Sequence, residues 1–372
     1  MFSSVIELTP GAAGDALSHF YRLRVRTIQP ETRDSAIIVF DVPPELQDKF
    51  RFVQGQYLTL RARIGDEDVR RSYSICSAVQ DNLLRVGIKR TPGGIFSNWI
   101  IDKLKAGDML EVMPPEGRFH VQLSPAHEKH YVAFVAGSGI TPIFSIIKTT
   151  LLTEPNSRFT LFYGNRASGS IMFREELAQL KDTFLDRFSL LYLMTREHQD
   201  VDLLNGRITG EKSEQLLQRF CRLEAIDTIF ICGPQDMAQD VRLKLKDLGF
   251  ADSKIKVELF TVNDFERARP SKSCAAPEGD CRVKLIVDGS ELQFTMQRDE
   301  SILDAALRRG IDLRHSCKSG VCATCRAKLI EGQVDMDSNY ALEDYEVQRG
   351  FILTCQSYPL TDSVTVDFDQ DN

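Results

Sequence analysis

The chain has 372 residues, of which 42% are hydrophobic and 27% charged, with a formal net charge of −7. A chain of this length is too long to fold around a single hydrophobic core of usual size, so two or three domains are expected. The acidic balance argues against a nucleic-acid partner. No basic stretch followed by a long apolar run opens the sequence, and its most apolar stretch, residues 131–147, is broken by glycine and proline. We therefore expect neither a signal peptide nor a membrane span, and a cytoplasmic protein.

The negative charge is concentrated near the C-terminus. Residues 282–372 carry 16 acidic and 10 basic side chains, whereas the other 281 residues carry 37 and 36. A small acidic module therefore follows a nearly neutral body. Such acidity serves solubility, or it steers the module toward a basic docking face on another protein. The sequence leaves both readings open.

Residues 1–125 are predicted to form an antiparallel β-barrel domain. From about residue 20 to 121, short runs such as "SAIIVFDV" and "YLTLRARI" alternate with Gly, Pro and Asp, which is typical of antiparallel strands joined by turns. One helix-like stretch interrupts them. Its apolar residues Ile95, Trp99, Ile100 and Leu104 are expected to share one face.

Residues 126–262 are predicted to form an α/β domain with a parallel sheet. Apolar strands such as "HYVAFVAG", "RFTLFYGN" and "DTIFICGP" alternate here with helix-like segments. Repeated β–α units of this kind place helices on both faces of a parallel sheet. Residues 263–281 lack periodicity and contain Pro, Ser, Gly and mixed charge, so they are interpreted as a linker.

Residues 282–372 are predicted to form a third domain of strands and one helix. Two strand-like runs precede the helical segment "SILDAALRRG". Ser301 suits the N-cap of that helix, Asp304 stands where a capping box has its acidic residue, and Gly310 suits the position after the helix end. A cysteine-rich loop and further strands follow.

Four of the nine cysteines have the spacing of an iron–sulfur site. Cys317, Cys322 and Cys325 stand in C-x4-C-x2-C spacing, and Cys355 follows in "FILTCQS". This is the plant-type [2Fe–2S] arrangement. Gly320 lies between the first two ligands, where the backbone must approach the cluster closely and a positive φ is expected. A structural zinc site is the alternative, although zinc usually takes paired C-x2-4-C ligands.

The segment "RRSYSIC", residues 70–76, is a candidate for a flavin site. The Tyr73 ring can stack on an isoalloxazine, the Ser74 hydroxyl can bond its N5 edge, and Arg71 can pair with a diphosphate. About twenty residues later, "TPGGIFS" (91–97) opens a helix with small residues, which exposes amide donors to phosphate. Together the two segments predict flavin binding, whereas "RSYS" alone is equally compatible with a plain half-buried strand.

An apolar strand ends in "AGSGITP", residues 136–142, which is the candidate dinucleotide loop. Gly137 and Gly139 permit a tight turn, and Thr141 with Pro142 opens a helix. The pattern departs from G-x-G-x-x-G because Pro142 takes the last glycine position. A simple tight β–α turn is therefore the alternative.

The end of the next strand, "YGNR", bears on the choice of nucleotide. A cofactor without a 2′-phosphate would be expected to meet an acidic residue here, but Asn165 and Arg166 stand there and Arg174 follows. Arginine at this point accommodates a 2′-phosphate, so NADPH is predicted rather than NADH. Surface solvation of the two arginines is the alternative.

A later strand ends in Cys232, Gly233 and Pro234. Ligands of α/β sheets bind at such carboxyl ends, and a thiol there can lie beside a nicotinamide. A buried cysteine at a turn is the alternative.

The order of these motifs resembles the ferredoxin–NADP reductase superfamily, in the form with a C-terminal plant-type ferredoxin domain. Further stretches, including "TTLLTEPNSRFTLFYGNR", "DESILDAALRRGIDL" and "PLTDSVTVDFD", are similar to the reductase subunits of bacterial phenylacetyl-CoA epoxidases. The similar stretches run from about residue 20 to 369. The resemblance implies an antiparallel β-barrel flavin domain, an α/β nucleotide domain and an α+β ferredoxin domain of the β-grasp type.

The resemblance also assigns roles to individual residues. Tyr73, Ser74 and Cys232 would lie at the reacting edge where flavin and nicotinamide meet, and Glu258 and Phe260 would close over the flavin. The other implied FAD contacts are Arg71, Gly87, Ile88, Lys89, Gly93, Gly94, Ile95, Phe96 and Ser97. The other implied NADPH contacts are Gly137, Gly139, Thr141, Asn165, Arg166, Arg174, Gly233 and Pro234. The implied metal ligands are Cys317, Cys322, Cys325 and Cys355.

The expected function is that of an NADPH-dependent FAD and [2Fe–2S] reductase that passes electrons one at a time to an oxygenase. The resemblance implies a di-iron partner that epoxidises the ring of phenylacetyl-CoA in aerobic phenylacetate degradation and docks on the acidic ferredoxin domain. Two alternatives stay open. The same cofactors would serve another oxygenase, hydroxylase or desaturase, or the chain would be a redox-regulatory protein whose cluster does not turn over NADPH.

Overall fold

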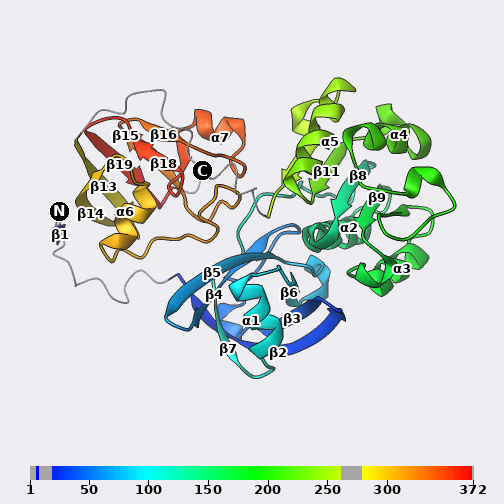
Figure 1. Cartoon of the computed structure of the whole chain (residues 1–372), viewed down its shortest axis with the longest axis horizontal. Helices are drawn as coiled ribbons and strands as arrows, with labels where there is room; N and C mark the ends of the chain where they lie inside the picture. Colours follow the sequence, from blue (N-terminus) through cyan, green and yellow to red (C-terminus); the bar gives the residue numbers. More distant parts are fainter. Residues whose placement is uncertain (1–5, 8–18, 261–278, 371–372) are drawn as a thin grey trace. The chain divides into compact units, whose positions relative to one another are not determined.

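The structure is a computed structural model, and it describes residues 6–7, 19–260 and 279–370 (Figure 1). The described residues divide into two compact units, one of residues 20–260 and one that contains residues 279–370. Most of the predicted linker, residues 263–281, lies outside the described residues. Its last two residues, Asp280 and Cys281, already belong to a strand.

A six-stranded antiparallel barrel forms the first part of residues 20–260. Its strands are β2 (Tyr21–Thr32), β3 (Ser35–Asp41), β4 (Tyr57–Ile64), β5 (Glu67–Ser74), β6 (Leu84–Lys89) and β7 (Met109–Val112). They pair in the order β5-β4-β7-β2-β3-β6, and a bridge between Ile75 and Val86 joins the two ends. The alternating apolar residues of the strands fill the interior with side chains such as Phe40 and Leu60. The predicted antiparallel barrel is confirmed.

Helix α1 (Ile95–Lys103) follows β6 and packs on the barrel core. The predicted apolar face of this helix is wrong at Ile95, which is 50% exposed. Ile100 and Leu104 are buried as predicted, and Phe96 joins them in place of Ile95, because residues spaced i, i+4 and i+8 share one face.

A five-stranded parallel sheet forms the second part of residues 20–260. Its strands are β8 (His130–Ala136), β9 (Arg158–Asn165), β10 (Phe188–Met194), β11 (Thr228–Cys232) and β12 (Ile255–Glu258), in the order β10-β9-β8-β11-β12. Its helices are α2 (Ile140–Thr153), α3 (Arg174–Thr183), α4 (Gly210–Phe220) and α5 (Gln235–Asp247). Figure 1 shows α4 and α5 on one face of the sheet and α2 and α3 on the other. The predicted α/β domain is confirmed.

The C-terminal unit is an α+β domain around a mixed six-stranded sheet. The sheet order is β1-β14-β13-β19-β15-β17. Its strands are β1 (Ile6–Glu7), β13 (Asp280–Val287), β14 (Ser290–Gln297), β15 (Arg326–Glu331), β17 (Phe351–Leu353) and β19 (Ser363–Asp367). A two-stranded sheet, β16 (Val334–Met336) with β18 (Ser357–Pro359), and helices α6 (Ile302–Arg308) and α7 (Asp344–Gln348) complete it.

The start and end of α6 follow the sequence pattern. The Ser301 hydroxyl accepts a hydrogen bond from the Asp304 amide at 3.1 Å, and Gly310 follows the helix with φ +77°. The predicted N-cap and terminal glycine are therefore confirmed. This helix end leads directly into the cysteine-rich loop.

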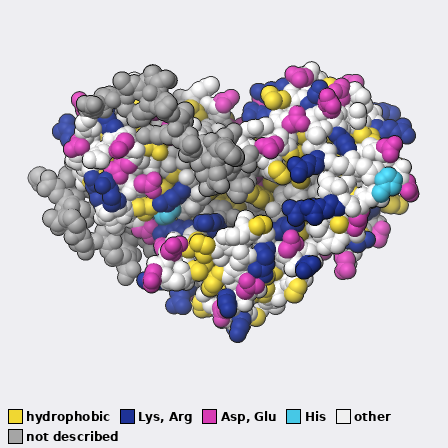
Figure 2. Space-filling view, viewed as in Figure 1, with side chains coloured by type: hydrophobic (Ala, Val, Ile, Leu, Met, Phe, Trp, Pro, Cys, Tyr) yellow, Lys and Arg dark blue, Asp and Glu magenta, His cyan; other side chains and the backbone are white. Residues whose placement is uncertain are grey.

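The surface carries charges of both signs. Figure 2 shows Lys and Arg side chains interspersed with Asp and Glu over the visible face of residues 20–260, rather than gathered into a field of one sign. Among the residues that the structure describes, no helix combines the length and apolar character needed to cross a bilayer.

Candidate functional site

The two candidate nucleotide loops meet where the strand order of the parallel sheet reverses. Chain connections leave β8 and β11 in opposite directions, which opens a crevice outside their carboxyl ends. The turn Gly137–Gly139 follows β8, and Gly233 follows β11. A Cβ on Gly139 would lie 2.2 Å from the carbonyl oxygen of Cys232. The two loops are therefore packed backbone against backbone, which requires glycine at this position.

Strand β6 of the barrel runs beside the first turn of α2. A Cβ on Gly87 would lie 2.7 Å from Thr141 Cγ2 and 3.3 Å from the Phe173 ring. Thr141 is buried and donates its hydroxyl hydrogen to the Ser138 carbonyl at 3.0 Å. Glycine at position 87 thus lets the predicted flavin strand approach the predicted nicotinamide loop closely.

Three strands bring Ser74, Cys232 and Glu258 together. The Ser74 hydroxyl donates to Glu258 Oε2 at 3.5 Å, and Cys232 and Glu258 are register partners on β11 and β12. Burial raises the pKa of Glu258 to about 8, although the Ser74 hydrogen bond lowers it. Burial and the neighbouring Glu258 charge raise the pKa of the Cys232 thiol. At neutral pH the site therefore holds a protonated carboxyl and a neutral thiol, both able to donate.

Tyr73 offers a flat ring beside this group. The ring stacks on Phe96, with centroids 6.0 Å apart and an interplanar angle of 28°. Burial raises the pKa of the Tyr73 phenol far above its usual range, so it stays protonated. Arg71 is exposed and donates to the Arg70 carbonyl at 2.7 Å. The "RSYS" segment thus presents a ring, a hydroxyl and a cation in sequence.

The N-terminus of α1 has the features of an anion site. Among the described residues, no side chain caps its first turn, and Gly94 is the N-cap. Gly93, just before it, has φ +71°, a conformation that suits glycine. The Ser97 hydroxyl accepts from the Thr91 amide at 3.1 Å and shapes the turn. Uncapped amides at a helix N-terminus suit a pyrophosphate.

The remaining predicted flavin contacts differ in what they can offer. Ile88 and Phe96 lie in the barrel core, so only their backbone atoms are able to reach a cofactor. Lys89 is half-buried, with Nζ 3.9 Å from Asp34. Ile95 is exposed, and Phe260, after β12, is 39% exposed.

The residues predicted to meet the adenosine phosphate lie at the carboxyl end of β9 and at the start of α3. Asn165 ends β9 and is buried, with 6% of its surface exposed. Arg166 follows it, and Arg174 opens α3; both are exposed. A buried amide group next to exposed guanidinium groups fits a nucleotide phosphate and its sugar.

The structure adds Arg196 to this group, a residue that the sequence analysis missed. Its backbone amide donates to the Arg166 carbonyl at 2.8 Å. Arg196 stands two residues after the end of β10, and Arg166 stands one residue after the end of β9. The signal that would have found Arg196 is a basic residue within two positions of the end of a parallel strand, since such strand ends gather at one edge of the sheet.

The four predicted cluster ligands lie at one end of the C-terminal unit. Cys317, Cys322 and Cys325 stand in the loop between α6 and β15. The Thr354 amide donates to the Cys325 carbonyl at 3.2 Å, which brings Cys355 beside this loop. Cys322, Cys325 and Cys355 are at most 6% exposed. Two segments 29 residues apart are thus joined by strand pairing.

The cysteines form two pairs. The sulfur atoms of Cys317 and Cys322 are 3.1 Å apart, and Cys325 is hydrogen-bonded to Cys355. In the described part of the chain, no group of three or more His, Cys, Asp or Glu side chains is arranged to hold a single metal ion. Two pairs of thiols are the arrangement that a cluster of two irons with four ligands needs.

The loop backbone also suits a cluster. Gly320 has φ +75°, and a Cβ there would lie 2.7 Å from the Ser338 carbonyl oxygen, so the expected positive φ is confirmed. The Ser319 amide donates to Cys317 Sγ at 3.4 Å. The Cys322 hydrogen bond and this amide outweigh burial and lower the pKa of Cys317 to about 5. Amide donors of this kind stabilise thiolate ligands.

Comparison with known proteins agrees with these three sites. Family models match residues 22–121 as an oxidoreductase FAD-binding domain, residues 134–243 as an oxidoreductase NAD-binding domain, and residues 285–360 as a 2Fe-2S iron-sulfur cluster binding domain. The predicted flavin, nicotinamide and cluster domains are therefore confirmed.

Two curated relatives match over almost their whole length. The chain is 44% identical to one of the subunits of 1,2-phenylacetyl-CoA epoxidase from Escherichia coli strain K12, over 95% of this chain and 99% of that protein. It is 33% identical to the ferredoxin reductase component of 3-ketosteroid-9-alpha-monooxygenase of Rhodococcus rhodochrous, over 93% of this chain and 96% of that protein.

A solved structure shares the fold. Phthalate dioxygenase reductase, described as a modular structure for electron transfer from pyridine nucleotides to [2Fe-2S], aligns with a TM-score of 0.56 and 23% identity, over 94% of this chain and 98% of that one. On these grounds the chain is an oxidoreductase that belongs to the ferredoxin–NADP reductase superfamily, among the reductase components of oxygenases that carry a C-terminal [2Fe–2S] domain.

Proposed function

We propose that this chain takes electrons from NADPH and delivers them singly to the di-iron phenylacetyl-CoA 1,2-epoxidase of aerobic phenylacetate degradation. The observation that carries the proposal is the 44% identity to the epoxidase protein of Escherichia coli, over 95% and 99% of the two chains. The relatives that serve other oxygenases are less similar, at 33% for the ketosteroid enzyme.

The residues of the electron entry site have separate tasks. When bound, FAD accepts the electron pair of a nicotinamide and releases electrons one at a time, as a [2Fe–2S] cluster requires. Tyr73 supports the flat face of the flavin, and Ser74 orients its reacting edge. Glu258, with its pKa raised to about 8, holds a proton next to Ser74 at neutral pH. The buried Cys232 would lie at the bottom of the crevice, beneath the nicotinamide.

The nucleotide phosphates are assigned to the loops and to the arginines. The phosphates of the cofactor would approach the backbone at the ends of β8 and β11, where the predicted contacts are Gly137, Gly139, Gly233 and Pro234. Asn165, Arg166 and Arg174 would bind the adenosine end, and the absence of an acidic residue after β9 favours NADPH. Arg196, whose amide is bonded to Arg166, would add a third guanidinium.

The exit site is assigned to the C-terminal unit. Cys317 and Cys322 would hold one iron and Cys325 and Cys355 the other, in keeping with the two pairs of thiols. The acidic surface of residues 282–372 would dock on the oxygenase. The cytoplasm is the proposed location, because clustered cysteines that bind a metal cluster rather than form disulfides are expected of a reducing compartment.

Reconstitution tests this proposal. The full chain, loaded with FAD and cluster, is mixed anaerobically with purified phenylacetyl-CoA epoxidase oxygenase and NADPH, and reduction of the di-iron centre is followed. We expect reduction at low salt and a slower rate at high salt, because the docking faces are charged. If the flavin is reduced but the epoxidase is not, while the oxygenase of a ketosteroid system is, the acceptor assignment is wrong.

A further inference from the structure

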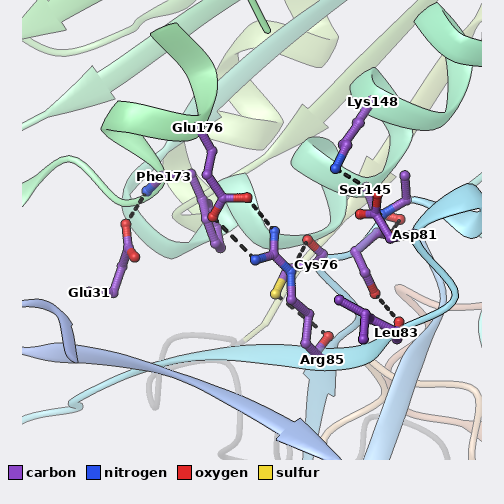
Figure 3. Close-up of polar contacts among 11 residues, drawn as sticks. Glu31, Cys76, Asp81, Leu83, Arg85, Ser145, Lys148, Phe173 and Glu176 are labelled. Carbon is purple, nitrogen blue, oxygen red and sulfur yellow. Dashed lines mark hydrogen bonds and ion pairs between the residues drawn. The ribbon is translucent and has the colours of Figure 1, made fainter. Parts of the chain in front are cut away.

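Polar contacts join the barrel and the nucleotide domain (Figure 3). Arg85 on β6 donates through Nη2 to Glu176 Oε2 at 2.7 Å and through Nη1 to Oε1 at 3.2 Å. Its Nε donates to the Cys76 carbonyl at 3.1 Å. Glu176 lies in the first turn of α3. One guanidinium group therefore links a barrel strand, the loop after β5 and a helix of the other domain.

This ion pair is partly removed from water. The side chains of Arg85 and Glu176 are 13% and 34% exposed. The guanidinium lies 5.5 Å from the ring centroid of Phe144 and 5.8 Å from that of Phe173, and these rings stack 4.8 Å apart. A bidentate pair in such surroundings is stronger and more directional than a pair at the surface.

A second contact holds the same helix. The Glu31 carboxylate, on β2, accepts a hydrogen bond from the Phe173 amide at 2.5 Å. Phe173 has φ +58°, a left-handed conformation that is unusual for a bulky residue. Such a conformation persists where the surroundings hold it in place. The barrel therefore fixes the start of α3 at two points.

The loop after β5 also holds α2. The Ser145 hydroxyl donates to the Ser77 carbonyl at 2.6 Å, and Lys148 Nζ pairs with Asp81 at 2.6 Å. Both helices that carry predicted nucleotide contacts are thus tied to the same short barrel segment.

These contacts involve residues that lie close in the chain to predicted cofactor residues. Ser74 lies two residues before Cys76, and Arg174 lies two residues before Glu176. We propose that Arg85 and Glu176 are a positioning pair, which fixes the pyridine-nucleotide half of the site against the flavin half. Hydride transfer needs reacting atoms about 3–3.5 Å apart, and a displacement of about 1 Å can slow it about 100-fold. The inference rests on the proposed NADPH-to-FAD electron entry, and not on which oxygenase receives the electrons.

Stopped-flow reduction of the full, cofactor-loaded chain by NADPH tests the pair. For Glu176→Gln we expect the limiting rate of flavin reduction to fall about tenfold, while the Kd for NADPH changes less than about threefold. The charge-transfer absorbance between nicotinamide and flavin should weaken. Electron transfer from dithionite-reduced protein to cytochrome c should keep its rate, because it does not use the nucleotide domain.

The matched control is Glu214→Gln. Glu214 pairs with Lys244 at 3.5 Å, is 32% exposed, and lies wholly within the nucleotide domain. This variant should keep the wild-type rate of flavin reduction. Arg85→Lys keeps the charge but not the bidentate geometry, so its limiting rate of flavin reduction should fall less than that of Glu176→Gln. This variant also tests the pair if Glu176→Gln fails to retain FAD.

The double variant Arg85→Gln/Glu176→Gln decides whether the two residues act as a unit. A positioning pair predicts that the double variant shows the same tenfold loss as Glu176→Gln alone and Arg85→Gln alone, whereas independent roles would multiply to about 100-fold. A wild-type chain that NADPH does not reduce would overturn the proposed function. A wild-type chain that NADPH reduces, with Glu176→Gln within twofold of it or with Glu214→Gln equally slow, would overturn the positioning pair.

Discussion

Ser74 Oγ lies 3.5 Å from Glu258 Oε2, although 184 residues separate the two in the chain. This contact joins the last residue of barrel strand β5 to the last residue of β12 in the parallel sheet. The predicted flavin edge and the predicted nicotinamide crevice thus share one hydrogen bond.

The Glu258 carboxyl should make stability depend on pH. Burial raises its pKa to about 8, whereas glutamate in an unfolded chain titrates near ~4.3. Between these values the folded state keeps a proton that the unfolded chain has released, so stability falls as pH rises through this window. We expect the Tm of the wild type to fall more steeply than that of Glu258→Gln from about pH 6 to 8. Parallel Tm curves for the two proteins would contradict the assignment.

Removing a cluster ligand should separate electron entry from electron exit. Cys355→Ser takes one of four thiolates from the loop, so the visible absorbance of the cluster should be lost. NADPH should still reduce the flavin, while reduction of cytochrome c falls at least about tenfold because the cluster that would carry electrons from the flavin to cytochrome c is lost. Cys221→Ser, which changes a half-buried thiol outside this loop, is the control and should keep both activities. A cluster retained in Cys355→Ser would exclude this residue as a ligand.

The close approach of the two nucleotide loops predicts the effect of one methyl group. In Gly139→Ala the new Cβ would lie 2.2 Å from the Cys232 carbonyl oxygen. Backbone atoms cannot move aside as a side chain does, so we expect a loss of about 1–3 kcal/mol in the free energy of unfolding. The Kd for NADPH should rise as the crevice is distorted. Gly169→Ala serves as the control in calorimetry and NADPH titration, since its Cβ meets nothing within 4 Å; equal Tm values for both variants would refute the argument.

The arginines after β9 should set the preference between NADPH and NADH. In Arg166→Ala/Arg174→Ala the 2′-phosphate would lose two cationic partners, so the KM for NADPH should rise about tenfold or more, at about 1.5–3 kcal/mol per charged hydrogen bond. The KM for NADH should change little, because NADH has no phosphate there. Steady-state ferricyanide reduction with each nucleotide measures both constants. An equal rise for both nucleotides would mean that the arginines bind the shared part of the cofactor.

Features that depend on neighbours in the chain were accessible from the sequence. The cysteine spacing, the Ser301 N-cap and the positive φ at Gly320 each follow from a few consecutive residues. The two α/β loops were found because parallel strands end at one edge of the sheet by geometry. The face of α1 was predicted incorrectly at Ile95, because apolar residues at positions 95, 96, 99 and 100 fit two overlapping helical faces.

The sequence by itself therefore determined the kinds of domain, their order, and the chemistry of each cofactor segment, because these depend on local spacing and periodicity. Only the tertiary structure decided which polar side chains meet across domains. Glu175 and Glu176 are adjacent and chemically alike, yet it is Glu176 that faces Arg85 at 2.7 Å. That choice comes from the packing of α3 on the barrel. The packing half-buries the Glu176 carboxylate, which then needs a charged partner, and it leaves Glu175 exposed to water. The same packing brings the predicted flavin and nicotinamide segments together.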